Sequence, residues 1–326
     1  MITWETPEIV PTRPFHRTLI RQSVLHGGTA IPFHIADKIT GDGALELTLT
    51  NNLAGTISGN LTIGDQKKTI DLTPHKAVKL KFKLPTQLSD SQVMPLNFPM
   101  VWDNGRETIK RNFTSYAFLV RPFKGSWDKI PVIPLTNRNI RRGAADDGFA
   151  ASLQMAWTKE KLLLRISVKD DHLCAGSGNR NRWNNDVVQV FFDTLCSAQR
   201  TGRKVFDDDD YDFSLMPTED GKRCEVFRAL SPFMQYTLGT AKDNTIATEI
   251  KASFNRTADG YVYLAEFPGP YIRPIELEPG WNMGFCVNVA DRDKGPNIER
   301  SVSLSTEPRA GGWNRPQTWP IAVLTE

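Results

Sequence analysis

The sequence predicts an all-β protein made of two consecutive β-sandwich domains. Short runs with alternating or β-branched hydrophobic residues recur along the chain, and turn-forming Gly, Asn, Asp and Pro residues separate them. The first 125 residues contain no segment with a sustained helical period. A length of 326 residues also exceeds what one small hydrophobic core normally organises.

The first domain is predicted to span residues 1–122. Its strand signals lie at residues 44–50, 56–63, 68–72, 77–84 and 115–120. Turn residues at 51–52, 64–65 and 103–105 punctuate these runs. Short strands at this spacing are typical of an antiparallel sandwich of the immunoglobulin-like type.

The second domain is predicted to span residues 123–326, after a junction rich in Pro and Gly at 121–134. Its strand signals lie at 150–157, 161–169, 186–193, 211–216, 224–230, 246–254, 261–267, 282–290, 300–304 and 320–325. Residues 159–160 are expected to close a tight hairpin, and residues 272–277 are expected to hold one helical turn.

The composition excludes several classes of protein. A net charge of +3, with basic residues spread along the chain, argues against a nucleic-acid partner. No apolar run approaches the ~20 residues that span a membrane. No signal peptide is recognisable at the start, so the chain is expected to be either cytoplasmic or a mature or excised segment, and its abrupt start favours the second. The four cysteines form no CxxC pair, which argues against a zinc site.

Two tryptophans in similar polar settings are the most informative feature of the second half. Trp183 lies in Arg-Trp-Asn-Asn-Asp at residues 182–186, and Trp313 lies in Gly-Gly-Trp-Asn-Arg-Pro at residues 311–316. Each indole has a flat apolar face and no obvious core to enter. Two such faces at one end of a sandwich could clamp a sugar ring. The alternative is that both rings pack on neighbouring loops.

The order of motifs in the second half resembles carbohydrate-binding module family 9 over about residues 125–326. The motifs that carry the resemblance lie at residues 156–171, 183–193, 211–215, 260–268 and 284–293, and the run closes with 312–316 and 321–324. The resemblance implies a β-sandwich with a sugar site built by two tryptophans. Such modules are usually appended to extracellular enzymes that degrade polysaccharides.

The resemblance also implies which residues contact the sugar. The two stacking rings correspond to Trp183 and Trp313, a carboxylate of the family to Gln189, and a polar residue of a late central strand to Asn288. The amides of the last two can hydrogen-bond sugar hydroxyls.

The chain departs from the family pattern at two positions. Ser214 stands where family members can carry an arginine, and Ala310 stands in place of an asparagine. Arg182 or Arg315 could supply the missing charged donor. The predicted sugar-contacting set is Trp183, Trp313, Gln189, Asn288, Ser214, Arg182, Asn314 and Arg315.

Acidic residues at strand ends are candidate metal ligands. Asp170 and Asp171 end one predicted strand, whereas Asp207 and Asp208 belong to a run of four aspartates that precedes another. Oxygen clusters suit calcium, and the family resemblance implies that calcium would be structural. The alternative for the aspartate run is a solvated acidic loop.

The predicted function is non-catalytic carbohydrate binding. The chain lacks the Gly-x-Ser-x-Gly, His-Glu-x-x-His and phosphate-loop motifs, and no carboxylate pair lies in a recognisable catalytic context. We expect a segment of a larger polysaccharide-processing protein, with a catalytic domain in the same parent chain, located outside the cell or at its surface. The alternative is a spacer segment of a glycoside hydrolase whose sugar site has degenerated. In either case the first domain is expected to space and orient its neighbours.

Overall fold

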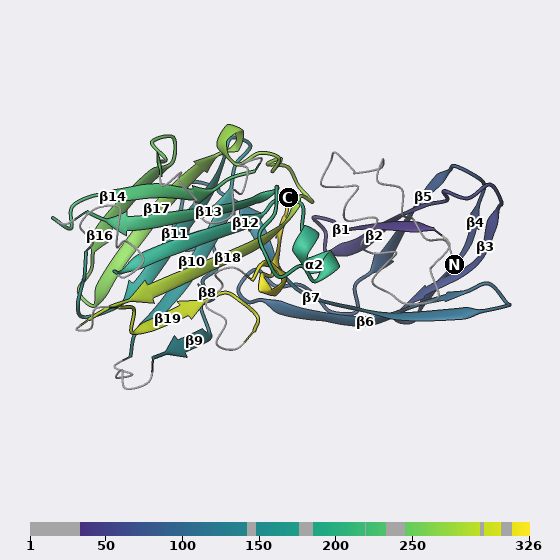
Figure 1. Cartoon of the computed structure of the whole chain (residues 1–326), viewed down its shortest axis with the longest axis horizontal. Helices are drawn as coiled ribbons and strands as arrows, with labels where there is room; N and C mark the ends of the chain where they lie inside the picture. The colour runs from purple at the N-terminus through teal and green to yellow at the C-terminus, as the bar shows by residue number, and fades with distance from the viewer. Residues whose placement is uncertain are drawn as a thin grey trace.

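The computed structural model describes residues 33–141, 148–175, 185–218, 220–232, 245–293, 297–307 and 315–326. The fold is almost entirely β, as the sequence predicts, and among these residues the α-helix is the short α2 (Ser197–Thr201). In the same described ranges, three 3₁₀ turns accompany it: η1 (Trp127–Lys129), η3 (Gly269–Tyr271) and η4 (Pro316–Thr318). The molecule is elongated, with two groups of strands side by side (Figure 1).

The first sandwich packs a three-stranded sheet against a four-stranded one. The first sheet has the order β1 (His34–Ile39), β2 (Ala44–Thr50), β5 (Ala77–Lys83). The second has the order β4 (Gln66–Leu72), β3 (Ile57–Ile63), β6 (Met94–Asp103), β7 (Thr108–Pro122). All pairs within these two sheets are antiparallel.

Strict alternation of residues builds the core of this sandwich. Leu45, Leu47 and Leu49 on β2 are buried, and the residues between them are only half-buried. They share one core with Trp102 on β6. Gly59 lies directly against that indole, because a Cβ at this position would stand 2.5 Å from Trp102 Cη2. The glycine therefore makes room for the largest side chain of the core.

The second sandwich has two larger sheets. One has the order β8 (Ile133–Pro134), β10 (Ala150–Trp157), β11 (Lys161–Lys169), β17 (Gly260–Pro268), β16 (Lys251–Arg256). The other has the order β9 (Asn137–Ile140), β19 (Arg300–Ser303), β18 (Asn282–Asp291), β12 (Val187–Asp193), β13 (Asp210–Pro217), β14 (Cys224–Leu230), β15 (Thr245–Ile246). Aromatic contacts join the two sheets: the ring of Phe192 on β12 lies 5.4 Å from that of Phe267 on β17.

Strands β7 and β20 (Ile321–Leu324) connect the two sandwiches. They pair in parallel, from Ala117 opposite Ile321 to Val120 opposite Leu324, and β20 also pairs with β18. Ala117 packs into the first core, whereas Phe118 and Val120 pack into the second. The predicted boundary between residues 122 and 123 stays a prediction, because β7 contributes to both cores. Figure 1 shows β6 and β7 running from the first group of strands toward the second.

The structure differs from the sequence prediction at several elements. Strand β6 carries Pro95 and Pro99, which donate no N–H to a ladder and obscured its pattern. The predicted strand at 246–254 is two strands, because Ala247 and Ile250 form a turn between β15 and β16. Where one helical turn was expected, at 272–277, a single turn closes between Ile275 N and Ile272 O at 3.1 Å, and the 3₁₀ turn η3 lies directly before it. Helix α2 was not expected.

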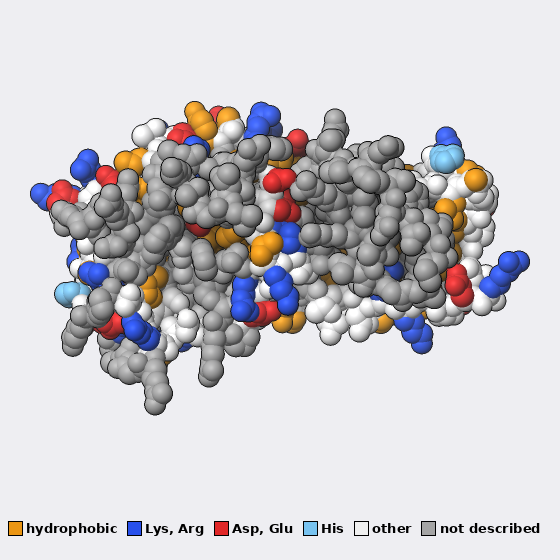
Figure 2. Space-filling model, in the orientation of Figure 1, with side chains coloured by type: hydrophobic (Ala, Val, Ile, Leu, Met, Phe, Trp, Pro, Cys, Tyr) orange, Lys and Arg blue, Asp and Glu red, His pale blue; other side chains and the backbone are white. Residues whose placement is uncertain are grey.

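Within the described residues, no helix combines the length and the hydrophobicity that a membrane span needs. Figure 2 shows basic and acidic side chains interspersed on the described part of one face. This mixture agrees with the small net charge of the chain.

Replacement of Asn282 should loosen the seam between the sandwiches. Its side chain accepts a hydrogen bond from Ile39 N at 2.7 Å and donates one to Ile39 O at 2.6 Å. We expect Asn282→Ala to lower the free energy of unfolding by about 1–3 kcal/mol, because two backbone groups lose their partner. Urea unfolding measures the change, and Asn255→Ala on the exposed edge of β16 is the control. Equal stability of the two variants would contradict this role.

Candidate functional site

A row of polar side chains crosses one face of the larger sheet in the second sandwich. Gln189 on β12 is the cross-strand partner of Asn288 on β18 and of Ser214 on β13, and Asn288 is the partner of Ser303 on β19. Directly opposed residues of antiparallel strands project from the same face of a sheet. We call these four residues the polar row.

The polar row lies on the face opposite the core. Val188 and Val190, which flank Gln189 along β12, pack into the core between the sheets. Alternation along a strand then directs Gln189 to the other face. The side chains on this outer face are nevertheless buried. Gln189 is 7% exposed, Asn288 5% and Ser214 0%.

Two oxygen atoms of the polar row have no hydrogen-bond partner among the residues that the structure describes. Asn288 Nδ2 donates to Gln189 Oε1 at 3.0 Å. Asn288 Oδ1 and Ser214 Oγ are buried and make no hydrogen bond within the described residues. A buried polar atom without a partner costs about 1–3 kcal/mol, so each such atom calls for a partner, which a water molecule or a ligand can supply. Hydroxyl groups of a ligand would satisfy both.

An aromatic group stands beside the polar row on the same face. Phe191 lies two residues after Gln189 and stacks on Trp319, with centroids 5.3 Å apart and planes at 21°. Phe206 packs on both rings, at 6.3 Å from Phe191 and 5.8 Å from Trp319. Trp319 is 1% exposed, so this indole is a packing element.

The structure brings together three of the predicted sugar-contacting residues: Gln189, Asn288 and Ser214. Arg315 is exposed and pairs with Glu307, with Nη1 and Oε2 2.9 Å apart. The remaining predicted residues, which lie outside the described part of the chain, are Trp183, Trp313, Arg182 and Asn314.

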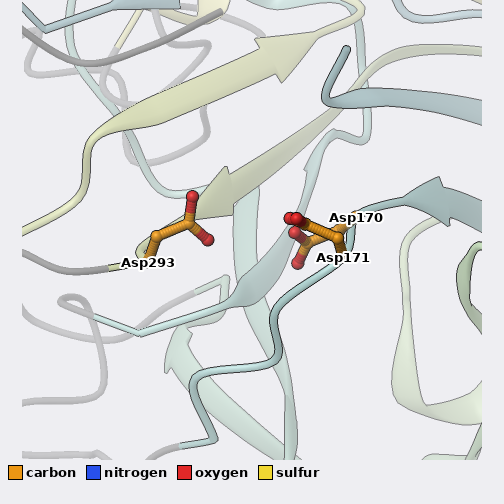
Figure 3. Close-up of side chains that lie close together, drawn as sticks. All are labelled: Asp170, Asp171 and Asp293. Carbon is orange, nitrogen blue, oxygen red and sulfur yellow. The ribbon is translucent and has the colours of Figure 1, made fainter. Parts of the chain in front are cut away.

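Five aspartates form a second feature, at the strand ends beside the polar row. Asp170 follows β11, Asp186 precedes β12 and Asp291 ends β18, and one carboxylate oxygen from each lies within 4.8 Å of the others. Carboxylate oxygens of Asp170, Asp171 and Asp293 also lie within 4.8 Å of one another, and Figure 3 shows these side chains. We call these five residues the acidic cluster.

Backbone N–H groups and one phenol hold the buried carboxylates of the acidic cluster in place. Asp186 accepts from Cys174 N at 2.6 Å and from Arg292 N at 2.9 Å. Asp170 accepts from His172 N and from the Tyr261 hydroxyl, each at 3.1 Å. Asp186 therefore ties together two loops that leave different strands.

One guanidinium offsets only part of the charge of the acidic cluster. Arg300, 2% exposed, pairs through Nε with Asp291 and through Nη2 with Asp293. The other oxygens of these two carboxylates, Asp291 Oδ1 and Asp293 Oδ1, are buried without a hydrogen-bond partner among the described residues. Burial, followed by the charge of nearby aspartates, raises the pKa of Asp291 to about 9. Burial is also the main cause that raises the pKa of Asp186 to about 8.

The other predicted metal ligands lie apart from the acidic cluster. Asp207 pairs with Arg203, with Oδ2 and Nε 2.9 Å apart, and Asp208 is exposed. Neither belongs to a group of three close acidic side chains among the described residues. A calcium role for Asp207 and Asp208 stays a prediction.

Three aspartates near Asp207 and Asp208 form another acidic group, whose carboxylates are hydrogen-bonded within the protein. Asp193, Asp209 and Asp210 lie close together. Asp193 accepts from Ser197 N at 2.9 Å and thereby caps α2, while Asp210 accepts from Arg203 Nη1 at 2.9 Å. Burial raises the pKa of Asp209 well above its usual range. These contacts stabilise the α2 loop, and the carboxylates are occupied.

Asp186, Asp291 and Asp293 were not among the metal ligands predicted from the sequence. Each stands at a strand end next to an apolar run, which is the signal that selected Asp170 and Asp171. Their mutual proximity depends on the pairing of β12 with β18, which brings residues about a hundred positions apart together.

Comparison with known proteins identifies the second sandwich. The profile of the family described as "Carbohydrate family 9 binding domain-like" matches residues 123–326, well over half of the chain. This chain belongs to that family. Family 9 modules are binding modules, and membership supports carbohydrate binding by this sandwich. The immunoglobulin-like type of the first sandwich stays a prediction.

Solved structures with a similar fold include family 9 modules. A carbohydrate-binding module of family 9 from Caldicellulosiruptor kristjanssonii in complex with cellotriose is 14% identical, with 64% of this chain and 92% of that chain covered and a TM-score of 0.46. The same organism's family 9 module in complex with glucose is 14% identical, with 64% and 95% covered and a TM-score of 0.44. No protein of curated function matches this chain.

Without a bound cation, the acidic cluster should make the family 9 sandwich less stable as pH rises. An aspartate in an unfolded chain titrates near 3.9, whereas the pKa of Asp186 is raised to about 8 and that of Asp291 to about 9. The folded state therefore binds more protons, so the free energy of unfolding falls from about pH 4 through about pH 9.

Urea unfolding in EDTA across this range tests the slope. We expect Asp186→Asn to flatten it and Asp65→Asn, an exposed turn residue, to leave it unchanged. A slope that is the same in all three proteins would contradict the prediction.

Proposed function

We propose that the family 9 sandwich binds carbohydrate without catalysis, with sugar hydroxyls bonded to the polar row. The observation that carries this proposal is the pair of buried unpaired atoms, Ser214 Oγ and Asn288 Oδ1, next to Gln189. The proposal retains Trp183 and Trp313 as the rings that stack on the sugar, with Arg182, Asn314 and Arg315 as flanking polar partners.

The chemistry of a pyranose suits such a site. Its C–H face loses contact with water on an indole, which favours binding by about 25 cal/mol per Å². Its hydroxyls then need polar partners, because otherwise desolvation cancels that gain. The polar row offers amide and hydroxyl groups but no charged donor. We therefore expect weak, permissive binding, on the order of micromolar to millimolar.

We further propose that the acidic cluster holds calcium as a structural cofactor. Carboxylate oxygens are the ligands that calcium prefers, and Asp291 Oδ1 and Asp293 Oδ1 lack other partners within the described residues. The residues therefore fit the ion. Asp170, Asp186 and Asp291 would hold it, with Asp171 and Asp293 beside them. Its charge would offset the repulsion between these carboxylates and fasten the ends of β11, β12 and β18.

In its native context the chain would serve a larger polysaccharide-processing protein outside the cell or at its surface. A catalytic domain in the same parent chain would act on the polymer that this sandwich holds, and the first sandwich would set the spacing. The second candidate function is a spacer with a degenerate sugar site. Ser214 and Ala310 favour it, since they replace an arginine and an asparagine that the family can carry.

Ser214→Ala should separate binding from stability. We expect the variant to lose affinity for sugar while its free energy of unfolding stays equal or rises, because a buried hydroxyl without a partner disappears. Trp313→Ala should abolish binding. Calorimetry and affinity electrophoresis against a panel of plant, algal and host glycans measure affinity, and urea unfolding measures stability.

Ser253→Ala on the exposed edge of β16 is the matched control and should keep full affinity. If the folded wild-type chain binds no glycan of the panel, the carbohydrate-binding proposal is refuted and the spacer function is favoured.

Calcium should stabilise the wild-type chain. Saturation at a hundred times the dissociation constant is worth about 2.7 kcal/mol, which would appear as a higher Tm in calcium than in EDTA. Asp186→Asn and Asp291→Asn should remove this difference, and Asp65→Asn should keep it. Differential scanning calorimetry at pH 7 measures all four proteins. An equal Tm of the wild-type chain in calcium and in EDTA would sink the calcium site.

A further inference from the structure

A groove opens on the surface between the two sandwiches, with a cavity volume of about 710 Å³. Its apolar part is formed by Val93 and Tyr116 of the first sandwich and by Ile133 and Leu304 of the second. A volume in this range suits a small organic ligand. We call it the inter-sandwich groove.

The position of Tyr116 follows from the strand that both sandwiches share. Phe118 projects from β7 into the second core, where its ring lies 6.3 Å from that of Phe285. Tyr116 precedes it by two residues and so projects from the same face of β7. It lies beyond the edge of that core and is 37% exposed. An aromatic ring of the first sandwich thus faces the inter-sandwich groove.

The polar groups of the inter-sandwich groove are almost all uncharged. Gln92 and Thr136 are exposed, Thr306 is half-buried, and Asn137 donates a hydrogen bond to Glu307 O. The structure describes all the residues that line the groove. Among them Arg138 carries a charge, and none is an aspartate or a glutamate. This surface offers neither a site for a cation nor a dense positive patch.

Strand register connects the polar row to one residue that lines the inter-sandwich groove. Asn137 on β9 is the cross-strand partner of Ser303, which is the partner of Asn288, which is the partner of Gln189. Each step crosses one strand spacing, so Asn137 stands three spacings, or about 14 Å, from Gln189. One side chain therefore belongs both to the extended row and to the groove lining.

We propose that the inter-sandwich groove is a second subsite for a neutral oligosaccharide whose first ring lies at the polar row. This inference rests on the proposed carbohydrate-binding function and adds the class of ligand, a chain rather than a single sugar. Tyr116 would stack on one sugar face, while amide and hydroxyl groups of Gln92, Asn137 and Thr306 would meet its hydroxyls. A monosaccharide or disaccharide at the polar row would not reach the groove.

The test compares short and long probes on the whole chain. Isothermal titration calorimetry uses cellobiose and cellohexaose, xylobiose and xylohexaose, and laminaribiose and laminarihexaose. For the glycan series that binds, we expect the hexasaccharide to bind the wild-type chain about tenfold more tightly than the disaccharide, since a second stacked ring contributes. Tyr116→Ala should reduce the hexasaccharide to the affinity of the disaccharide and leave the disaccharide unchanged.

Three further variants distinguish a loss of groove contacts from a general effect on folding. Tyr116→Phe keeps the ring and should keep the gain with chain length. Tyr271→Ala removes another exposed tyrosine, on η3, and should also keep it. Gln92→Ala changes an exposed loop residue and should lower the affinity for the hexasaccharide alone.

The outcomes distinguish the two proposals. Binding of both probes without a gain in affinity for the hexasaccharide, or a gain that survives Tyr116→Ala, overturns the groove subsite and leaves the polar row as the sugar site. Failure of the folded wild-type chain to bind any probe overturns the groove subsite together with the carbohydrate-binding function.

Discussion

The pairing of β12 with β18 is the constraint on which the core and the site both depend. One register places Val188 and Val190 in the core, sets Gln189 opposite Asn288, and brings Asp186 near Asp291. A shift by a single residue would turn every side chain of β12 to the other face. It would bury the amide of Gln189 in the apolar core and separate the carboxylates. Core, polar row and acidic cluster are therefore specified together.

The sequence predicts local structure well and non-local geometry poorly. Alternation and turn residues located most strands, including β2 and β11, because these signals lie within a few positions. Strand β9, with one aliphatic side chain among four residues, has no such signal. Gln189, Asn288 and Ser214 were found through the family resemblance. Their adjacency depends on strand pairings between distant segments, which a hydrophobic pattern cannot encode.

The ionisation of the acidic cluster affects both the stability of the second sandwich and the hydrogen bonds that hold the backbone at Cys174 and Arg292. Burial and mutual repulsion oppose ionisation of Asp186 and Asp291, yet Asp186 holds the backbone at Cys174 and at Arg292. The segment that begins at Cys174 and returns at Asp186 contains Trp183 in its sequence. A cation that ionises the cluster would strengthen the same hydrogen bonds, because a carboxylate accepts better than a carboxylic acid. The ends of this segment would then be fixed before a sugar arrives.

The first sandwich is joined too closely to the second to be only a passive extension. Strand β7 supplies side chains to both cores, and Asn282 of the second sandwich bonds both backbone groups of Ile39 in the first. Two such connections at different points resist hinge motion between the sandwiches. Tyr116 is therefore held in a fixed place relative to β9 and β19. A ring that is already in place costs little entropy when a ligand stacks on it, so a rigid seam favours binding across it.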